Sequence, residues 1–433
     1  MKRVMKDCSD ATMHESLPLL TSASGAGPSG VMPARCDHFA ALDLVKTVAI
    51  VLVVLEHSMR STLFVRNATW WEALVGDLSA ACTPMFLYVS GFLADSRESA
   101  PTASLLRRYY EGAPTIRRTA WRLLVPYAVS AVVVACFHGA LPMVIARAST
   151  LPQFLVRLLT FDILGLHYYV LLALQAAVAL PAVRWACTAD AAAAMAVLVV
   201  LVLCKAVAFQ CSNRIGLSMW LQQRSPMSAL PFFVLGYVTR THLHRRVLNG
   251  SQRLRQLVFG SLIACLLPWL VGAIPSFTTA DGTPMPPSPT PTLRLSETVA
   301  LAREARKVLG ACALPLVLTW YAPHRLCVHP LVRWASGASY TIYLYHMVAI
   351  DAYSLELFHE AHPQQRVDVA LLVSAGPEAQ PRRDFERALL GLGSSLAIAL
   401  LSEATLGKAM ALTLFGARLP FQPCGGAREE SAG

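Results

Sequence analysis

Long apolar runs dominate this chain of 433 residues and constrain what it can fold into. Hydrophobic residues make up 55% of the sequence, charged residues only 15%, and the mean hydropathy is +0.49. The apolar residues gather into runs of about 18–22, the length at which a helix crosses a bilayer. The sequence therefore predicts an all-α fold, a polytopic transmembrane helix bundle whose first partner is the lipid bilayer.

About ten spans are predicted from these runs. They fall near residues 42–60, 72–94, 123–145, 166–184, 190–209, 226–242, 256–274, 304–322, 337–358 and 387–406. Residues 1–40 are expected to form a disordered cytoplasmic tail, 41–410 the transmembrane domain and 411–433 a C-terminal tail. Within the domain, residues 275–292 form a loop rich in Pro, Thr and Ser.

Basic residues cluster in two predicted loops and indicate how the bundle is oriented. Lys and Arg collect on the cytoplasmic side of membrane proteins, so we attribute the net charge of +11 to topology and expect no nucleic-acid partner. The two loops carry Arg97, Arg107, Arg108, Arg117, Arg118 and Arg122, and Arg240, Arg245, Arg246, Arg253 and Arg255. They share a side with the N-terminal tail, which predicts that both termini are cytoplasmic. The sequons at Asn67 and Asn249 then fall on the non-cytoplasmic and the cytoplasmic side, respectively.

Two further patterns bear on location and on metals. Glu15, Leu19 and Leu20 have the spacing of a dileucine sorting signal, which suggests an endosomal or lysosomal address. The eleven cysteines follow no spacing typical of a zinc site, so no metal is expected.

Two ionisable side chains, Lys46 and His57, lie inside the first apolar run. Each costs roughly 2.5–3.5 kcal/mol at the centre of a membrane helix, so such residues point to function. A helix places the two about 20° apart in rotation and roughly 16 Å apart along its axis, which suits a polar channel leading inward. His57 is then a natural general base. Both residues also have a purely structural explanation. Lys46 would extend its ammonium to the membrane interface or pair with Asp43, and a neutral His57 would hydrogen-bond to a neighbouring helix.

Other candidate residues lie in later segments. Arg118 and Arg122 are four residues apart, so one helix face can present both to a polyphosphate, although anchoring at the cytoplasmic interface explains them equally. His167 at the start of the fourth span, with Tyr343 and His346 in the ninth, fits either an aromatic interfacial belt or an acceptor groove.

These segments, in this order, resemble the acyltransferase-3 family of integral membrane acyltransferases. The first helix of that family typically reads Leu-Asp-x-Leu-Arg, with a histidine further along, and this pattern is approximated here by Leu42–Lys46 and His57. The run Pro84–Leu93 looks like the family's aromatic-rich second span. Further counterparts are residues 117–126, 167–171, 230–237 and 339–346. The resemblance covers roughly residues 38–410.

The resemblance implies transfer of an acyl group, usually acetyl, from a coenzyme A thioester to a hydroxyl of a carbohydrate or related acceptor. It implies that the CoA phosphates are held by Lys46, Arg118 and Arg122. The family's arginine is a lysine at Lys46, and the two are not interchangeable in a bidentate phosphate site, so a weaker donor contact is expected.

The resemblance also implies the roles of the remaining residues. His57 removes the proton of the acceptor hydroxyl or carries the acyl group itself, and Glu56 orients or recharges it. His167, Tyr343 and His346 lie in segments that have counterparts in the family, and of their two interpretations we expect acceptor binding. Two other classes stay open at this point: a transporter with the same residues in a polar cavity, and an inactive member of the family.

Overall fold

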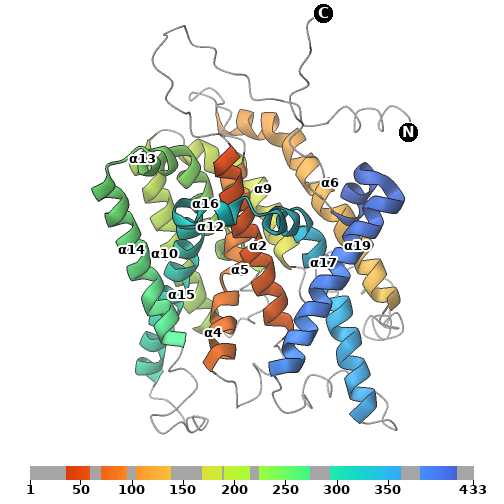
Figure 1. Cartoon of the computed structure of the whole chain (residues 1–433). Coiled ribbons are helices and arrows are strands. Elements are labelled where there is room, and N and C mark those ends of the chain that lie inside the picture. Colours follow the sequence, from red (N-terminus) through yellow and green to blue (C-terminus); the bar gives the residue numbers. More distant parts are fainter. Residues whose placement is uncertain are drawn as a thin grey trace, which may run out of the picture.

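The computed structural model describes residues 36–58, 70–94, 104–137, 168–187, 190–214, 224–273, 293–361 and 381–416, and all regular structure in these ranges is helical (Figure 1). The elements are α2 (Cys36–Ser58), α4 (Trp70–Ser79), α5 (Cys82–Leu93), α6 (Leu105–Phe137), α9 (Tyr168–Cys187), α10 (Ala191–Arg214), α12 (Pro226–Val238), the π-helix η1 (Thr239–Leu243), α13 (His244–Leu248), α14 (Gln252–Ala273), α15 (Leu293–Tyr321), α16 (His324–Cys327), α17 (Pro330–Ala361) and α19 (Pro381–Phe415).

The predicted all-helical bundle is confirmed for the described residues. Among them, four helices are long and apolar enough to cross a bilayer: Tyr168–Cys187, Ala191–Phe209, Gln252–Leu270 and Phe385–Gly407. Helices also occupy the other six predicted ranges, but some are short or carry charges, as α2 does at Asp43, Lys46 and Glu56. The number of ten crossings therefore stays a prediction.

Several boundaries differ from those expected. The predicted span 72–94 is two helices, α4 and α5, because Pro84 lies in the first turn of α5, where its ring disfavours a helix continuing from α4. Helix α2 begins at Cys36, inside the expected tail, and α19 continues to Phe415, past the expected boundary at 410. The loop 275–292 and the dileucine pattern lie outside the described residues.

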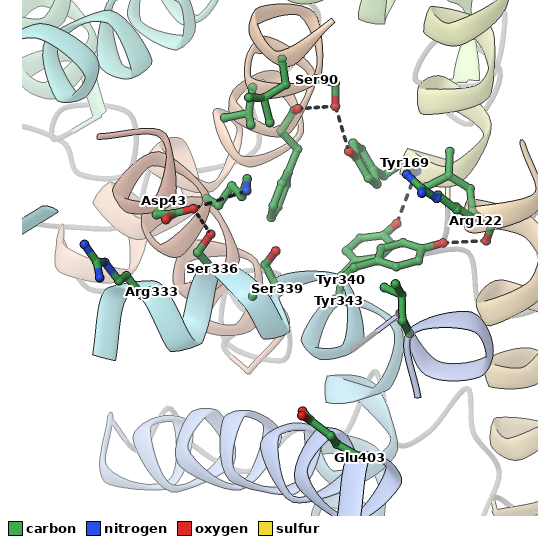
Figure 2. Close-up of a pocket in the computed structure, with 18 residues that line it drawn as sticks. Asp43, Ser90, Arg122, Tyr169, Arg333, Ser336, Ser339, Tyr340, Tyr343 and Glu403 are labelled. Carbon is green, nitrogen blue, oxygen red and sulfur yellow. Dashed lines mark hydrogen bonds and ion pairs between the residues drawn. The ribbon is translucent and has the colours of Figure 1, made fainter. Parts of the chain in front are cut away.

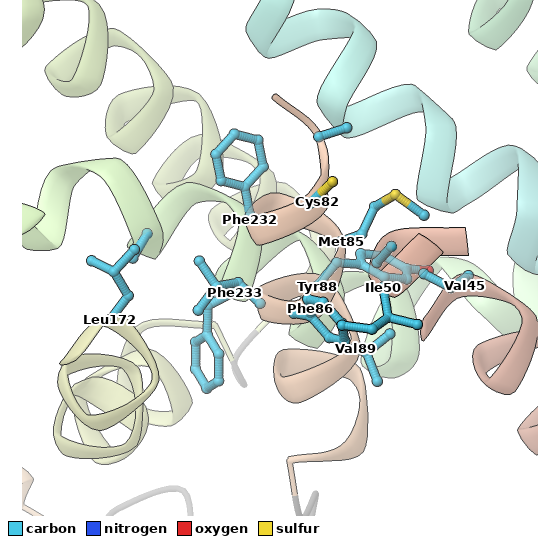
Figure 3. Packing of buried hydrophobic residues seen from close by; sticks show 14 of the residues in the cluster. Val45, Ile50, Cys82, Met85, Phe86, Tyr88, Val89, Leu172, Phe232 and Phe233 are labelled. Atoms are coloured by element: carbon cyan, nitrogen blue, oxygen red, sulfur yellow. The ribbon is translucent and has the colours of Figure 1, made fainter. Parts of the chain in front are cut away.

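Close packing of α5 against α12 forms the centre of the bundle. A Cβ atom at Gly91 would overlap the carbonyl of Phe233, and one at Gly236 would overlap the carbonyl of Tyr88. Glycine at both positions lets the two backbones touch, a common device of membrane helices. Figure 3 shows the apolar side chains packed around this contact, including Phe232, which is 2% exposed.

Helix α2 lies against this centre and is enclosed by α5, α17 and α19 (Figure 1). Two side-chain hydrogen bonds join α2 to α17: Thr47 Oγ1 donates to the carbonyl of Val332 at 2.9 Å, and Ser336 Oγ donates to Asp43 Oδ1 at 2.6 Å. A further bond joins two of the enclosing helices, since Thr341 Oγ1 of α17 donates to the carbonyl of Phe415 of α19 at 2.9 Å. The helix that carries Lys46 and His57 is thus held by its neighbours through polar contacts as well as packing.

Candidate active site

A cavity of about 680 Å³ lies among α2, α5, α6, α9, α17 and α19 (Figure 2). Its lining residues are Asp43, Lys46, Phe86, Val89, Ser90, Leu93, Arg122, Leu123, Tyr169, Arg333, Ser336, Gly337, Ser339, Tyr340, Tyr343, Glu403, Leu412 and Gly416. Three residues singled out from the sequence, Lys46, Arg122 and Tyr343, therefore meet in one space although they lie on three different helices.

Charged side chains form part of the cavity wall. Lys46 Nζ donates to Asp43 Oδ1 at 3.5 Å, and the same carboxylate oxygen accepts from Ser336. The lining contains three cationic side chains, Lys46, Arg122 and Arg333, against two acidic ones, Asp43 and Glu403. The ion pair with Asp43 fixes the position of Lys46 at the wall, where an anion that enters the cavity meets it.

Aromatic rings form another part of the wall, with Arg122 beside them (Figure 2). The rings of Tyr340 and Tyr343 stack with centroids 6.5 Å apart and planes 8° apart, and Tyr169 meets Tyr343 edge-on at 5.5 Å. Hydrogen bonds hold two of these rings in place: the Tyr340 hydroxyl donates to the carbonyl of Leu123 at 2.7 Å, and the backbone N–H of Tyr169 donates to the Tyr343 hydroxyl at 3.3 Å. The wall is therefore rigid and joins α6, α9 and α17.

Two imidazoles lie behind this wall. The rings of His57 and His346 stack at 5.1 Å with an interplanar angle of 29°, and the Tyr343 ring is 6.4 Å from that of His346. His346 is 1% exposed, whereas His57 is partly exposed. His346 Nδ1 lies 2.9 Å from the carbonyl of Ile342 and 3.0 Å from that of Tyr343. Because a carbonyl only accepts, Nδ1 is assigned as the protonated nitrogen, and in neutral His346 the lone pair is on Nε2.

The other predicted residues are placed less centrally. Arg118 is exposed on α6, one turn before Arg122, and is not part of the cavity lining. Glu56 is partly buried, and its position next to His57 in the helix turns its side chain about 100° away. His346 packs on His57 and does not line the cavity itself. His167 lies outside the described residues.

Sequence reasoning missed Arg333, Ser336 and Glu403. The first two belong to a stripe of polar and aromatic residues on α17, spaced three or four apart, which runs through Tyr340 and Tyr343 to His346. Residues at that spacing share one helix face, so the stripe was detectable. Glu403 is an acidic residue inside an apolar run, which is itself a signal of function. In the described part of the chain, no three His, Cys, Asp or Glu side chains converge as metal ligands.

These observations define a membrane helix bundle with a cavity of mixed charge beside a stacked pair of histidines. Comparison with known protein families matches residues 39–376 to the acyltransferase-3 family, described as an acyltransferase domain. This range is well over half of the chain, so the protein belongs to that family and is an acyltransferase, as the motifs predicted. Comparisons with curated proteins and with solved structures gave no match.

The matched range ends before α19, which nevertheless forms part of the site. Glu403, Leu412 and Gly416 line the cavity from this helix. The helix is kinked at Gly407, whose φ of 76° and ψ of 161° are not helical, and Gly416, the first residue after its end at Phe415, has a φ of 70°. A Cβ atom at Gly416 would overlap the ring of Tyr340, so a glycine there lets the end of α19 close onto the aromatic wall.

Proposed function

We propose that this acyltransferase moves an acyl group, preferably acetyl, from acyl-CoA to a hydroxyl of a carbohydrate or related acceptor at a membrane. One observation carries the proposal: cationic side chains and a wall of tyrosines share a cavity, and that wall borders the stacked pair of His57 and His346. A donor with a charged head and a long arm fits such a site, with its head among the cations and its thioester near the histidines.

The phosphates of the donor bind Lys46 and Arg122, joined by Arg333. Guanidinium groups can hold phosphate oxygens through two parallel hydrogen bonds, and the lysine adds a point charge. Asp43 holds Lys46 at the wall and lowers the net charge of the cavity, which favours release of the CoA product. Arg118, exposed one turn away, contributes to attraction of the donor rather than to its final contacts.

His57 acts as the general base. It takes the proton of the acceptor hydroxyl, the oxygen attacks the thioester carbonyl, the carbon–sulfur bond breaks, and the CoA thiolate takes the proton back. His346 restricts the orientation of the His57 ring by stacking on it, and its own ring is fixed by two backbone carbonyls. Glu56 then has at most an indirect, positioning role. An acyl group carried on His57 is the alternative course, and a trapped acyl-enzyme would distinguish it.

The acceptor approaches along the tyrosine wall. The hydroxyl of Tyr343 and that of Ser90, which lies 3.5 Å from the Tyr169 hydroxyl, offer hydrogen bonds to a sugar. The proposal also assigns acceptor binding to His167, which lies outside the described residues. The protein is multi-pass with a cytoplasmic N-terminus, which places the cations on the side of the cytosolic donor, and the dileucine pattern favours an endosomal or lysosomal membrane.

Turnover of acetyl-CoA by the purified full-length protein tests the proposal. We expect release of free CoA with a hydroxyl acceptor present, lost in His57→Ala and kept in His324→Ala, an exposed histidine of α16 that is not part of the cavity lining. Binding of acetyl-CoA without turnover across a panel of sugars would point to a different acceptor or an inactive member. Absence of acetyl-CoA binding by wild-type protein would overturn the proposed donor.

A further inference from the structure

A second cavity, of about 650 Å³, lies where α13, α14 and α15 meet, and it shares no lining residue with the first. It is lined by Val247, Leu248, Gln252, Arg255, Gln256, Phe259, Trp320 and Tyr321. An arginine, two glutamines and a tyrosine form a polar part, and Phe259 and Trp320 form an aromatic one. The proposed transfer reaction makes no use of this space.

The wall of this cavity is preformed. The Tyr321 hydroxyl donates to the backbone carbonyl of Arg255 at 2.8 Å, and the Phe259 ring packs on the Tyr321 ring with centroids 4.8 Å apart. The indole N–H of Trp320 donates to His244 Nδ1 at 3.2 Å. Burial, together with the charge of Arg245, lowers the pKa of His244, so the imidazole stays neutral and able to accept this bond. The side chain of Arg255 is exposed above these fixed rings.

Along α14 the side chains change from polar to apolar, in the same order as the head group and the acyl chains of a phospholipid. Gln252, Arg255 and Phe259 are three or four residues apart, so they share one face of α14. Leu267, 52% exposed, lies about two turns further on and is rotated roughly 80° from Phe259. Polar side chains therefore come first and apolar ones follow, over a helix that is long and apolar enough to span the bilayer. A phospholipid whose head group binds Arg255 would place its acyl chains along the exposed apolar surface of α14.

Charge around the cavity selects the head group. Arg245, Arg246 and Arg253 are exposed within the same turn region as Arg255, and the sequence predicts that this end of the bundle faces the cytoplasm. Anionic phospholipids are concentrated in the cytoplasmic leaflet, and basic pockets between helices at that level bind their head groups. Trp and Tyr are favoured at the same depth, where one side of the ring meets water.

We propose that this cavity binds the phosphate head group of an anionic phospholipid, with Arg255 as its main cationic contact and Phe259, Trp320 and Tyr321 as the surface for the glycerol and upper acyl chains. The bound lipid would hold α14 and α15 together at the membrane surface, at a site separate from the one that binds the acyl donor.

Competition between two lipids with identical acyl chains tests the proposal. The full-length protein would be mixed in detergent with equimolar dioleoyl phosphatidylglycerol and dioleoyl phosphatidylcholine, and retained lipid counted by native mass spectrometry. We expect phosphatidylglycerol to be preferred, and Arg255→Gln to lower that preference by roughly fivefold, the effect of one basic residue near a charged surface. The bond from Tyr321 uses the backbone of Arg255, so this variant keeps the wall of the cavity.

Arg253→Gln is the matched control, because it removes the same charge from the same exposed helix end without touching the cavity lining. We expect it to keep the preference of the wild type to within about twofold. Equal losses in the two variants would overturn the proposal in favour of diffuse surface charge. Equal retention of both lipids by the wild type would overturn it as well. Displacement of phosphatidylglycerol by inorganic phosphate would assign the cavity to a soluble anion instead of a lipid.

Discussion

Lys46 is a charged residue whose surroundings in the bundle explain how it is tolerated. Asp43, one turn earlier on α2, accepts a hydrogen bond from the Lys46 ammonium, and the same carboxylate accepts another from the hydroxyl of Ser336 on α17. The lysine is therefore neither an unpaired charge in the membrane nor a side chain that only snorkels to the surface. It is placed at a cavity wall, with part of its surface open to a ligand.

Replacement of Lys46 tests its role in donor binding. We expect Lys46→Met to raise the KM for acetyl-CoA roughly tenfold, because one charge-assisted contact to a phosphate is lost while Asp43 keeps its bond from Ser336. Lys46→Arg restores the family's residue and should bind the donor at least as tightly as the wild type. An unchanged KM in Lys46→Met, measured with acetyl-CoA at fixed acceptor, would remove Lys46 from the donor site.

Arg333 gives a second prediction, for a residue that lines the cavity but was not singled out from the sequence. Its side chain is exposed at the start of α17, so its contact with a phosphate is partly screened. We expect Arg333→Gln to raise the KM for acetyl-CoA about two- to fivefold with little change in kcat. Arg325→Gln, an exposed arginine of α16 outside the cavity, should leave both constants unchanged. A similar effect of both variants would indicate general attraction of the donor.

Residues of the candidate site could be predicted where the signal was a charge inside an apolar run. Lys46 was found in this way, and Arg122 from its spacing to Arg118. The stacking of His57 on His346 could not be predicted, because it depends on how α2 docks against α17, and periodicity within one helix carries no information about its neighbour. Glu403 carried a charge signal too, but the sequence does not show which cavity a single acidic residue faces.

At the scale of elements, the contact between α5 and α12 determines how closely the bundle packs. The sequence predicted both helices, but it did not predict that Gly91 and Gly236 would be opposed. The break between α4 and α5 was also missed, since hydropathy averaged over a long run hides a proline in the first turn of a new helix. Apolar length thus predicts that helices exist, whereas small residues and prolines decide where they bend and touch.

Gly91→Ala tests this contact. We expect the added methyl group to lower the free energy of unfolding by about 1–3 kcal/mol, because it overlaps the backbone of α12 and one helix must move. The control is Gly260→Ala on α14, where an added Cβ has no neighbouring atom within 4 Å and a helix-favouring alanine should be neutral or stabilising. Thermal unfolding in detergent would compare the two, and equal melting temperatures would show that α5 and α12 do not pack this closely.

At the scale of the whole molecule, the two cavities and the basic loops imply one orientation in the membrane. The donor is cytosolic in the proposed reaction, so the cavity that Lys46 lines near the middle of α2 must open toward the cytoplasm. The turn between α13 and α14, which is rich in arginine, is predicted to lie on that same side. In Figure 1 the start of α2 and the short helix α13 lie toward the same end of the bundle, as a shared cytoplasmic side requires.

Two sequons that are predicted to lie on opposite sides of the membrane make this orientation measurable. Asn249 ends α13 and is exposed, so if its side of the membrane were the lumenal one, the residue would be accessible to glycosylation. Asn67 follows α2 in the chain and lies outside the described residues, and the sequence predicts that it is on the non-cytoplasmic side. In protein expressed in a eukaryotic cell, we expect a mass shift on glycosidase treatment that Asn67→Gln abolishes and Asn249→Gln leaves intact. The reverse pattern would place the arginine-rich turn in the lumen. The cations of the first cavity would then face away from the cytosolic donor, and both the proposed reaction and the proposed inner-leaflet lipid would fail for the same reason.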